Sequence, residues 1–223
     1  MEMQNDNMEL IPVISVILIT ETSDAGSVEN AINSVLSQTG NFSVQITIVL
    51  KEHDSRVADL CQTYKALYPE KIRFYTRLTA DVTDNISIYG DYILLCRDYE
   101  ILSDSKKLGI QCNFLSTHPE YTICFHNVSG SGYPILSEGD YNTKCLSLSQ
   151  VIKYYSPLIR VKANPVKFNF MLYEKDGGML FVRDSYRGLM RCISGISSSI
   201  TPTKKRAPLL KNISEYLTIS KRF

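Results

Sequence analysis

The sequence predicts an α/β fold built on a doubly wound, mostly parallel sheet flanked by helices. Residues 11–19 and 44–50 are near-continuous runs of β-branched and aliphatic side chains, a pattern typical of strands buried on both faces of a parallel sheet. A stretch with helical spacing of apolar residues follows each run, and this alternation continues to residue 128. Regular alternation of strand and helix favours a parallel sheet covered by helices.

Five strands and three helices are expected in this first half, each bounded by polar or helix-breaking residues. The expected strands cover residues 11–19, 44–50, 72–75, 92–96 and 121–128. The expected helices cover residues 27–38, 56–68 and 103–117. Ser27 is a suitable N-cap for the first helix, and Pro69 and Pro119 end the second and third.

The pattern changes after residue 128. Residues 129–140 are rich in glycine and serine and are expected to form a loop, and residues 178–182 a late strand. Helices are expected at residues 146–155 and 209–219. No internal repeat and no second core is evident, so we expect residues 1–223 to form a single domain.

Composition and charge indicate which classes of binding partner the protein is expected to have. The formal net charge of +1 and the dispersed tyrosines argue against a nucleic-acid-binding protein. Six basic residues gather near the C-terminal end, where either a solvated helix face or peripheral contact with an anionic membrane explains them. These are Lys204, Lys205, Arg206, Lys211, Lys221 and Arg222.

The cysteines and the N-terminal region predict a cytoplasmic protein. The six cysteines are scattered through apolar stretches without metal-ligand spacing, which favours reduced, buried thiols. The apolar run at residues 11–20 is too short to span a bilayer. Acidic rather than basic residues precede it, so no signal peptide is expected.

Several short segments, taken in order, resemble family 2 glycosyltransferases. An apolar strand and a threonine-containing loop lead into a helix that ends in Ser-Val-Leu-Ser-Gln-Thr at residues 34–39. Similar segments follow at residues 68–73, 90–94, 118–121 and 195–198. The resemblance implies the GT-A fold, with a nucleotide-binding half at residues 11–128 and an acceptor-side extension at residues 129–223.

The resemblance also implies a chemistry. Such a protein transfers a sugar from a nucleotide-sugar donor, for example a UDP-linked one, to a glycan or lipid-linked acceptor in surface polysaccharide assembly. Mg²⁺ or Mn²⁺ bound by an Asp-x-Asp motif after the fourth strand neutralises the diphosphate leaving group. A pair of aspartates after the second strand binds the nucleoside, and an acidic residue in the second half deprotonates the acceptor hydroxyl.

This sequence departs from the family pattern at the nucleotide-binding positions. Thr20 and Glu21 lie where the first loop of the family meets the nucleotide. After the second strand, Leu50 and Lys51 occupy the positions where the paired aspartates are expected, and Glu52 and Asp54 follow them. A polar strand end also explains Thr20 and Glu21, and a solvated loop also explains Glu52 and Asp54. The nucleotide-binding candidates are Thr20, Glu21, Lys51, Glu52, Asp54 and Arg97.

The metal-binding positions are altered as well. Arg97 replaces the first carboxylate and Tyr99 the principal metal ligand. Asp98 and Glu100 still form an acid-x-acid pair, which is either a surviving metal site or an exposed loop of mixed charge. Alternatively, Arg97 and Lys51 bind the phosphates directly, since a guanidinium group suits bidentate phosphate binding.

The base is the third altered position. Residues 164–165 fall where the acidic residue is expected, and the nearest acids are Glu174 and Asp176, in a segment that also has the composition of a turn. Three hypotheses remain open. The protein is a glycosyltransferase, a metal-independent transferase, or a catalytically inactive homologue that serves as a binding or scaffolding module and has lost its cation.

Overall fold

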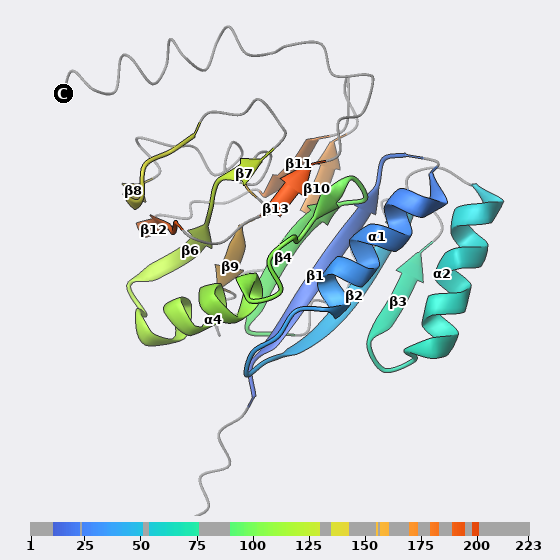
Figure 1. Cartoon of the computed structure of the whole chain (residues 1–223), viewed down its shortest axis with the longest axis horizontal. Coiled ribbons are helices and arrows are strands. Elements are labelled where there is room, and N and C mark those ends of the chain that lie inside the picture. Colours follow the sequence, from blue (N-terminus) through green and yellow to red (C-terminus); the bar gives the residue numbers. More distant parts are fainter. Residues whose placement is uncertain are drawn as a thin grey trace, which may run out of the picture.

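The computed structural model shows an α/β fold in which helices cover a central sheet (Figure 1). The structure describes residues 11–22, 24–50, 54–75, 90–129, 135–142, 155, 157–160, 170–173, 179–182, 189–194 and 198–200. The helices are α1 (Ala25–Leu36), α2 (Ser55–Leu67) and α4 (Lys107–Thr117). The strands in the first half are β1 (Val13–Thr20), β2 (Ser43–Leu50), β3 (Ile72–Tyr75), β4 (Tyr92–Arg97), β5 (Glu100–Ile101), β6 (Tyr121–Phe125) and β7 (Val128–Ser129). Those in the second half are β8 (Gly139–Asn142), β9 (Leu158–Arg160), β10 (Phe170–Tyr173), β11 (Met179–Val182), β12 (Leu189–Cys192) and β13 (Ser198–Ile200).

The main sheet is mixed but mostly parallel. Its strand order is β3-β2-β1-β4-β9-β6-β12-β8. The first four strands are parallel, as are β6 and β12, whereas β9 and β8 run in the opposite direction. The expected α/β class with a mostly parallel sheet is therefore confirmed. Short strands from the second half, β9 and β12, complete this sheet beside β4 and β6.

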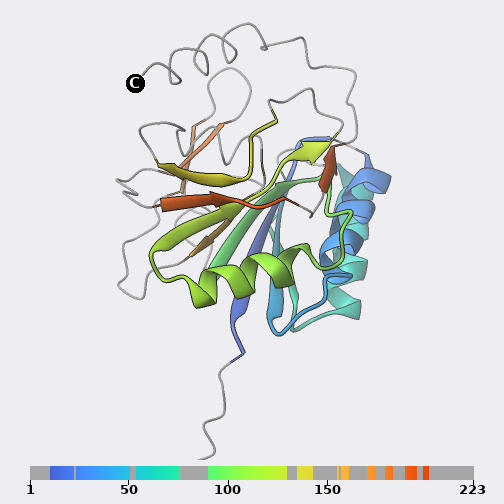
Figure 2. The same ribbon diagram turned by 60° about the vertical axis from the view of Figure 1, so that its left-hand side comes forward.

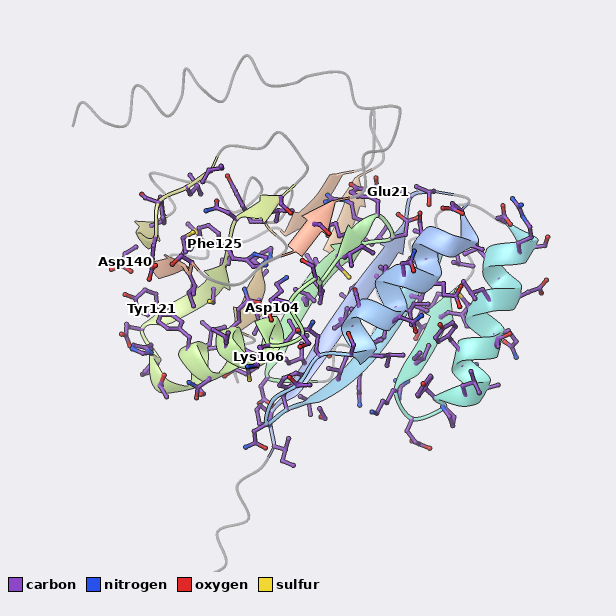
Figure 3. The ribbon with its side chains drawn as sticks, viewed as in Figure 1. Glu21, Asp104, Lys106, Tyr121, Phe125 and Asp140 are labelled. Carbon is purple, nitrogen blue, oxygen red and sulfur yellow. The ribbon has the colours of Figure 1, made fainter. Side chains whose placement is uncertain are left out.

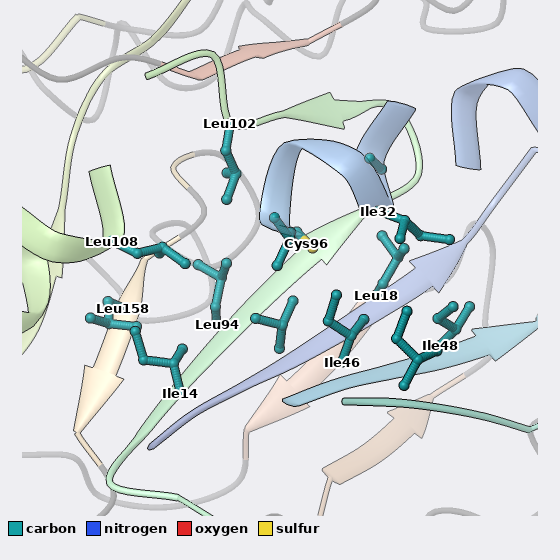
Figure 4. Close-up of a cluster of buried hydrophobic side chains, with 14 of the residues drawn as sticks. Ile14, Leu18, Ile32, Ile46, Ile48, Leu94, Cys96, Leu102, Leu108 and Leu158 are labelled. Carbon is teal, nitrogen blue, oxygen red and sulfur yellow. The ribbon is translucent and has the colours of Figure 1, made fainter. Parts of the chain in front are cut away.

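The core lies between the sheet and its helices. Alternate residues of β1, such as Ile14 and Leu18, point to one face and pack with Val28 and Ile32 of α1 (Figure 4). Leu108 of α4 joins the same cluster. Figure 2 shows α1 and α2 side by side, and the Tyr64 hydroxyl of α2 donates to Asn33 of α1 at 2.8 Å. Each fully buried aliphatic side chain contributes about 1.5–3 kcal/mol to folding.

Helix α1 begins at an aspartate rather than at the expected serine. The carboxylate of Asp24 accepts hydrogen bonds from the backbone N–H groups of Gly26 and Ser27, both at 3.2 Å. The Ser27 hydroxyl donates to the same carboxylate at 2.6 Å and holds the pKa of Asp24 below its ordinary value. The N-cap is therefore Asp24, and the prediction of Ser27 was wrong by one turn.

Other differences from the expected elements concern helix and strand ends. Helix α4 begins at Lys107 rather than at residue 103, because the Asp104 carboxylate accepts from the Lys106 N–H at 2.8 Å and forms a turn ahead of the helix. The expected strand at 121–128 is divided into β6 and β7. The late strand is present as β11, whereas the helix expected at 209–219 and all but one residue of that at 146–155 lie outside the described residues.

The segment at residues 34–39 joins α1 to the loop before α4. The Gln38 amide donates to the carbonyl oxygen of Asp104 at 2.8 Å and accepts from the N–H of Leu108 at 2.9 Å. The N–H of Thr39 donates to the carbonyl oxygen of Ser105 at 2.7 Å. Gln38 thus satisfies one of the N–H groups that the first turn of a helix leaves without an intrahelical partner. In this chain the family-like segment has a structural role, away from the carboxyl ends of the strands.

Buried thiols are distributed through this fold. Five cysteines in the described ranges are buried and free, as the sequence predicts, and they are Cys61, Cys96, Cys112, Cys124 and Cys192. Burial raises the pKa of Cys61 and Cys112 to about 11 and also raises that of Cys96. Such thiols behave as small apolar side chains at neutral pH and disfavour ionisation in the folded state.

We expect the free energy of unfolding to fall as the pH rises above 9. Cys61, Cys96 and Cys112 ionise in the unfolded chain near pH 9.0, before they ionise in the folded chain. Stability that is present below the unfolded pKa is therefore lost as the pH rises toward the folded pKa. Each thiol removes about 1.4 kcal/mol for every pH unit in this interval.

Lys107 opposes this loss, because burial lowers its pKa to about 8 and the unfolded chain holds the proton up to about pH 10.5. The opposing effects of one lysine and three thiols still leave a net decrease in the free energy of unfolding. Urea unfolding under reducing conditions measures the effect, in a series from pH 8 up to the pKa of Cys61 in the folded protein, which is about 11. The Cys61→Ala variant should lose less stability over this range, and a wild-type value that stays constant or rises would contradict the prediction.

Candidate functional site

The candidate site lies at the carboxyl edge of the parallel strands, where ligands bind in open α/β sheets. β1 and β4 are neighbours, and Ile19 is paired with Arg97 at their ends. The N–H of Asp98 donates to the carbonyl oxygen of Ile19 at 3.1 Å, so the segment after β4 lies against the end of β1. Glu21 follows directly after β1 at this edge (Figure 3).

Asp98 is hydrogen-bonded to the loop that follows β1. One carboxylate oxygen, Oδ2, accepts hydrogen bonds from the N–H of Glu21 at 3.1 Å, the N–H of Thr22 at 2.7 Å and the Thr22 hydroxyl at 2.6 Å. Asp98 is fully buried, and this burial raises its pKa although the hydrogen bonds from Thr22 and Glu21 favour the charged form. The second oxygen, Oδ1, is buried without a hydrogen-bond partner among the described residues. The carboxylate is therefore enclosed in the protein.

Arg97 joins two further carboxylates. Its Nε donates to Oε1 of Glu21 at 3.0 Å, and its Nη1 donates to Oε1 of Glu100 at 3.2 Å. The backbone N–H of Arg97 donates to Oε2 of Glu100 at 3.1 Å, so Glu100 accepts from Arg97 through both oxygens. The guanidinium carbon lies 5.9 Å from the centre of the Tyr99 ring, a cation–π distance. A positive charge is thus held between two negative ones.

A buried lysine completes this group of charges. Lys107, the first residue of α4, is fully buried, and Glu100 is 3% exposed. Burial lowers the pKa of Lys107 to about 8, while the negative charge of Glu100 acts in the opposite direction. His126 is also fully buried, and burial together with the positive charge of Lys107 holds its pKa well below the ordinary value. His126 is accordingly neutral, and Glu100 is the carboxylate whose negative charge acts on Lys107.

These carboxylates do not fit a divalent cation as they stand. Mg²⁺ and Mn²⁺ require several accessible oxygen ligands. One oxygen of Asp98 already accepts from three donors and the other is buried, while Glu100 is bound by Arg97. Across the described ranges, no cluster of three or more His, Cys, Asp or Glu side chains is arranged to hold a metal. The structure therefore brings the candidate ligands Asp98 and Glu100 together but engages both with protein groups.

The nucleotide-binding candidates are only partly within the described residues. The hydroxyl of Thr20 is buried at the end of β1 and donates to the carbonyl oxygen of Val49 at 3.4 Å. Asp54 is the N-cap of α2 and accepts from the N–H of Arg56 at 2.9 Å. The side chain of Arg56 lowers the pKa of Asp54. Lys51 and Glu52 lie outside the described ranges.

The candidate bases, Glu174 and Asp176, also fall on residues that the structure does not describe.

Two residues of the site were not identified from the sequence. Thr22, which binds Asp98, lies in a polar loop whose composition suggested only a turn. Lys107 resembles an ordinary solvated helix residue in the sequence, and nothing in the sequence marks it as buried.

Of the helices that the structure describes, none is long and apolar enough to cross a bilayer.

Comparison with known proteins adds information on the fold. No family model matches the chain. Uncharacterized proteins of Mycobacterium tuberculosis and Mycobacterium bovis are 30% identical over 107 residues, which cover 45% of this chain and 31% of each relative. The chain thus spans about a third of the length of these curated relatives.

Solved structures resemble the chain more completely. Staphylococcus aureus TarS 1–349 aligns over 84% of this chain and 60% of its own, with 16% identity and a TM-score of 0.57. The same protein in complex with UDP-GlcNAc aligns over 86% of this chain and 59% of its own, with 14% identity and a TM-score of 0.58. A Pyrobaculum calidifontis mannosyltransferase in complex with GDP-Man and Mn²⁺ covers 52% of this chain and 35% of its own, with 10% identity and a TM-score of 0.43. The chain is structurally similar to GT-A glycosyltransferases, as the sequence resemblance implied, and at this identity the likeness concerns the fold.

Proposed function

We propose that this chain binds a nucleotide-sugar donor at the carboxyl edge of β1, β2 and β4 and transfers its sugar to a glycan or lipid-linked acceptor. The observation that carries the proposal is the connection made by Asp98, whose carboxylate fixes Glu21 and Thr22 beside the end of β4. The loops after β1 and β4 are thereby held together at the edge where this class of sheet binds its ligands. TarS, which shares the fold, has been solved with UDP-GlcNAc, which supports a UDP-linked donor.

The proposed roles follow the positions of the residues. The nucleotide would contact the end of β1 and the loop after it, at Thr20 and Glu21. It would also contact the segment after β2, which contains Lys51, Glu52 and Asp54. In the second half, Glu174 or Asp176 would accept the proton of the acceptor hydroxyl. Because β9 and β12 from the second half complete the sheet beside β4 and β6, we propose that the whole chain acts as one glycosyltransferase-like domain.

The proposed setting is surface polysaccharide assembly at the inner face of the membrane. The resemblance to family 2 glycosyltransferases implies this setting. A cluster of six basic residues between Lys204 and Arg222 supports a cytoplasmic protein that contacts the membrane surface peripherally. Each basic residue near an anionic surface contributes about 1 kcal/mol to such binding.

A second candidate function is that of an inactive homologue that binds or scaffolds a partner. The ion pairs of Arg97 favour it, because Glu21 and Glu100 are already neutralised within the protein. A transferase must stabilise the negative charge that develops on the departing diphosphate, and a site without an available cation supplies little of that stabilisation.

Calorimetric titration with UDP and GDP tests the proposed function, with uridine as a control that lacks the diphosphate. We expect one diphosphate to bind and uridine to bind much more weakly. Release of UDP from UDP-GlcNAc, or of GDP from GDP-mannose, then tests donor cleavage. Binding without donor cleavage or transfer would support the inactive homologue, whereas the absence of binding by every nucleoside diphosphate would contradict both the transferase and the donor site.

A further inference from the structure

Three carboxylates gather after β1 and β4 without a metal-ion site among the described residues. They belong to Glu21, Asp98 and Glu100, and hydrogen bonds or ion pairs join all of them to the same short segment. Asp98 is fully buried and Glu100 is 3% exposed, so neither charge is screened by solvent. Close, buried carboxylates repel one another and favour protonation unless a positive charge lies between them.

The first such positive charge is the guanidinium group of Arg97. It contacts Glu21 at 3.0 Å and Glu100 at 3.2 Å, and its side chain is 12% exposed. A cation that bridges two carboxylates in this way has the geometric role of a metal ion in an acidic site. A guanidinium group also matches phosphate oxygens better than an ammonium group does, because its N–H groups form a planar fork.

The second positive charge is the ammonium group of Lys107. It is fully buried at the start of α4, and the negative charge of Glu100 favours its protonated form. Glu100 therefore contacts Arg97, the last residue of β4, and its negative charge also acts on Lys107, the first residue of α4. The other titratable groups that interact electrostatically with Lys107 are the thiols of Cys96 and Cys124 and the imidazole of His126.

Arg97 lies between the carboxylates of Glu21 and Glu100 and contacts both, at 3.0 Å and 3.2 Å. A divalent cation in an acidic site would take this same position. We infer that Arg97 replaces the divalent cation of this site, and that it also binds the diphosphate of the donor. This inference rests on the proposed donor site and makes donor binding independent of metal.

The wild-type protein gives the first test. Titration with UDP in the presence of EDTA and in the presence of Mn²⁺ should give the same affinity within a factor of two. The electron paramagnetic resonance signal of free Mn²⁺ should be unchanged by the protein. A tenfold gain in UDP affinity with Mn²⁺, or Mn²⁺ binding by the wild type, would overturn the inference while the proposed donor site stands.

Variants of Arg97 give the second test. Arg97→Gln should weaken UDP binding at least tenfold in EDTA, and equal affinity would contradict the inference. Arg97→Asp should release Glu21 and Glu100, add a carboxylate and create Mn²⁺ binding that the resonance signal detects. Lys65→Asp, at an exposed position of α2, makes the same change of charge and should bind no Mn²⁺.

The two proposals fail in different ways. If UDP and GDP bind under no condition, the donor site is wrong, and the Mn²⁺ titrations of the wild type and of Arg97→Asp still decide whether Arg97 occupies the place of a cation. If Arg97→Asp folds poorly, the dependence of its melting temperature on Mn²⁺ replaces the resonance measurement. A rise with Mn²⁺ that Lys65→Asp lacks supports the inference, and no rise contradicts it.

Discussion

Asp98→Ala is expected to lower the free energy of unfolding by about 3 kcal/mol. The lost carboxylate oxygen accepts from the N–H groups of Glu21 and Thr22 and from the Thr22 hydroxyl. Alanine leaves these donors without that acceptor at a part-buried position, and each unsatisfied group carries a desolvation penalty. Urea unfolding measures the change, and faster amide hydrogen exchange at Glu21 and Thr22 would locate it in the loop after β1.

Two further variants separate this role of Asp98 from a general effect of substitution. Asp98→Asn keeps one oxygen of the same shape as acceptor, so it should lose much less stability than Asp98→Ala. Asp59→Ala, at an exposed position of α2, should change stability by less than about 0.5 kcal/mol. If Asp98→Ala unfolds as the wild type does, the hydrogen bonds of Asp98 do not hold the loop. The donor site would then lose the observation on which it rests.

The strands and helices of the first half were predictable because each has an uninterrupted local pattern. β1 is apolar along most of both faces, whereas β2 carries Gln45 and Thr47 on one face and ends in three buried aliphatic residues. The N-cap of α1 was harder, because Asp24 and Ser27 are both good capping residues and only the hydrogen bonds distinguish them. β9 has three residues, too few to show a period, so its place between β4 and β6 could not be anticipated.

The candidate site was predictable in its position but not in its contacts. The resemblance located Arg97, Asp98 and Glu100 after the strand expected at residues 92–96, and the structure brings these residues to the carboxyl edge, with Arg97 as the last residue of β4. Glu21, the second carboxylate that binds Arg97, lies 76 residues away along the chain, a distance at which a single sequence gives no sign of pairing. Lys107 was missed because a lysine in a helix is usually solvated, and its burial follows from tertiary packing alone.

Lys107→Met is expected to lower the free energy of unfolding by about 3 kcal/mol at pH 7. The substitution preserves much of the buried volume but removes one of the two positive charges that act on Glu100, which is 3% exposed. Breaking a buried ion pair by removing one partner leaves an undercompensated charge, whereas removing both charges is much less destabilising. Lys106→Met, at the neighbouring exposed position, is the matched control and should unfold as the wild type does (Figure 3).

A double-mutant cycle with Glu100→Gln decides whether Lys107 and Glu100 act as partners. Glu100→Gln also weakens the contacts of Arg97, so it should be destabilising by itself. If the two residues are coupled, Lys107→Met combined with Glu100→Gln should lose less stability than the sum of the single changes, by about 1–3 kcal/mol. Strictly additive losses would show that Lys107 does not compensate Glu100. Arg97, which contacts Glu100 at 3.2 Å, would then compensate this carboxylate without a contribution from Lys107.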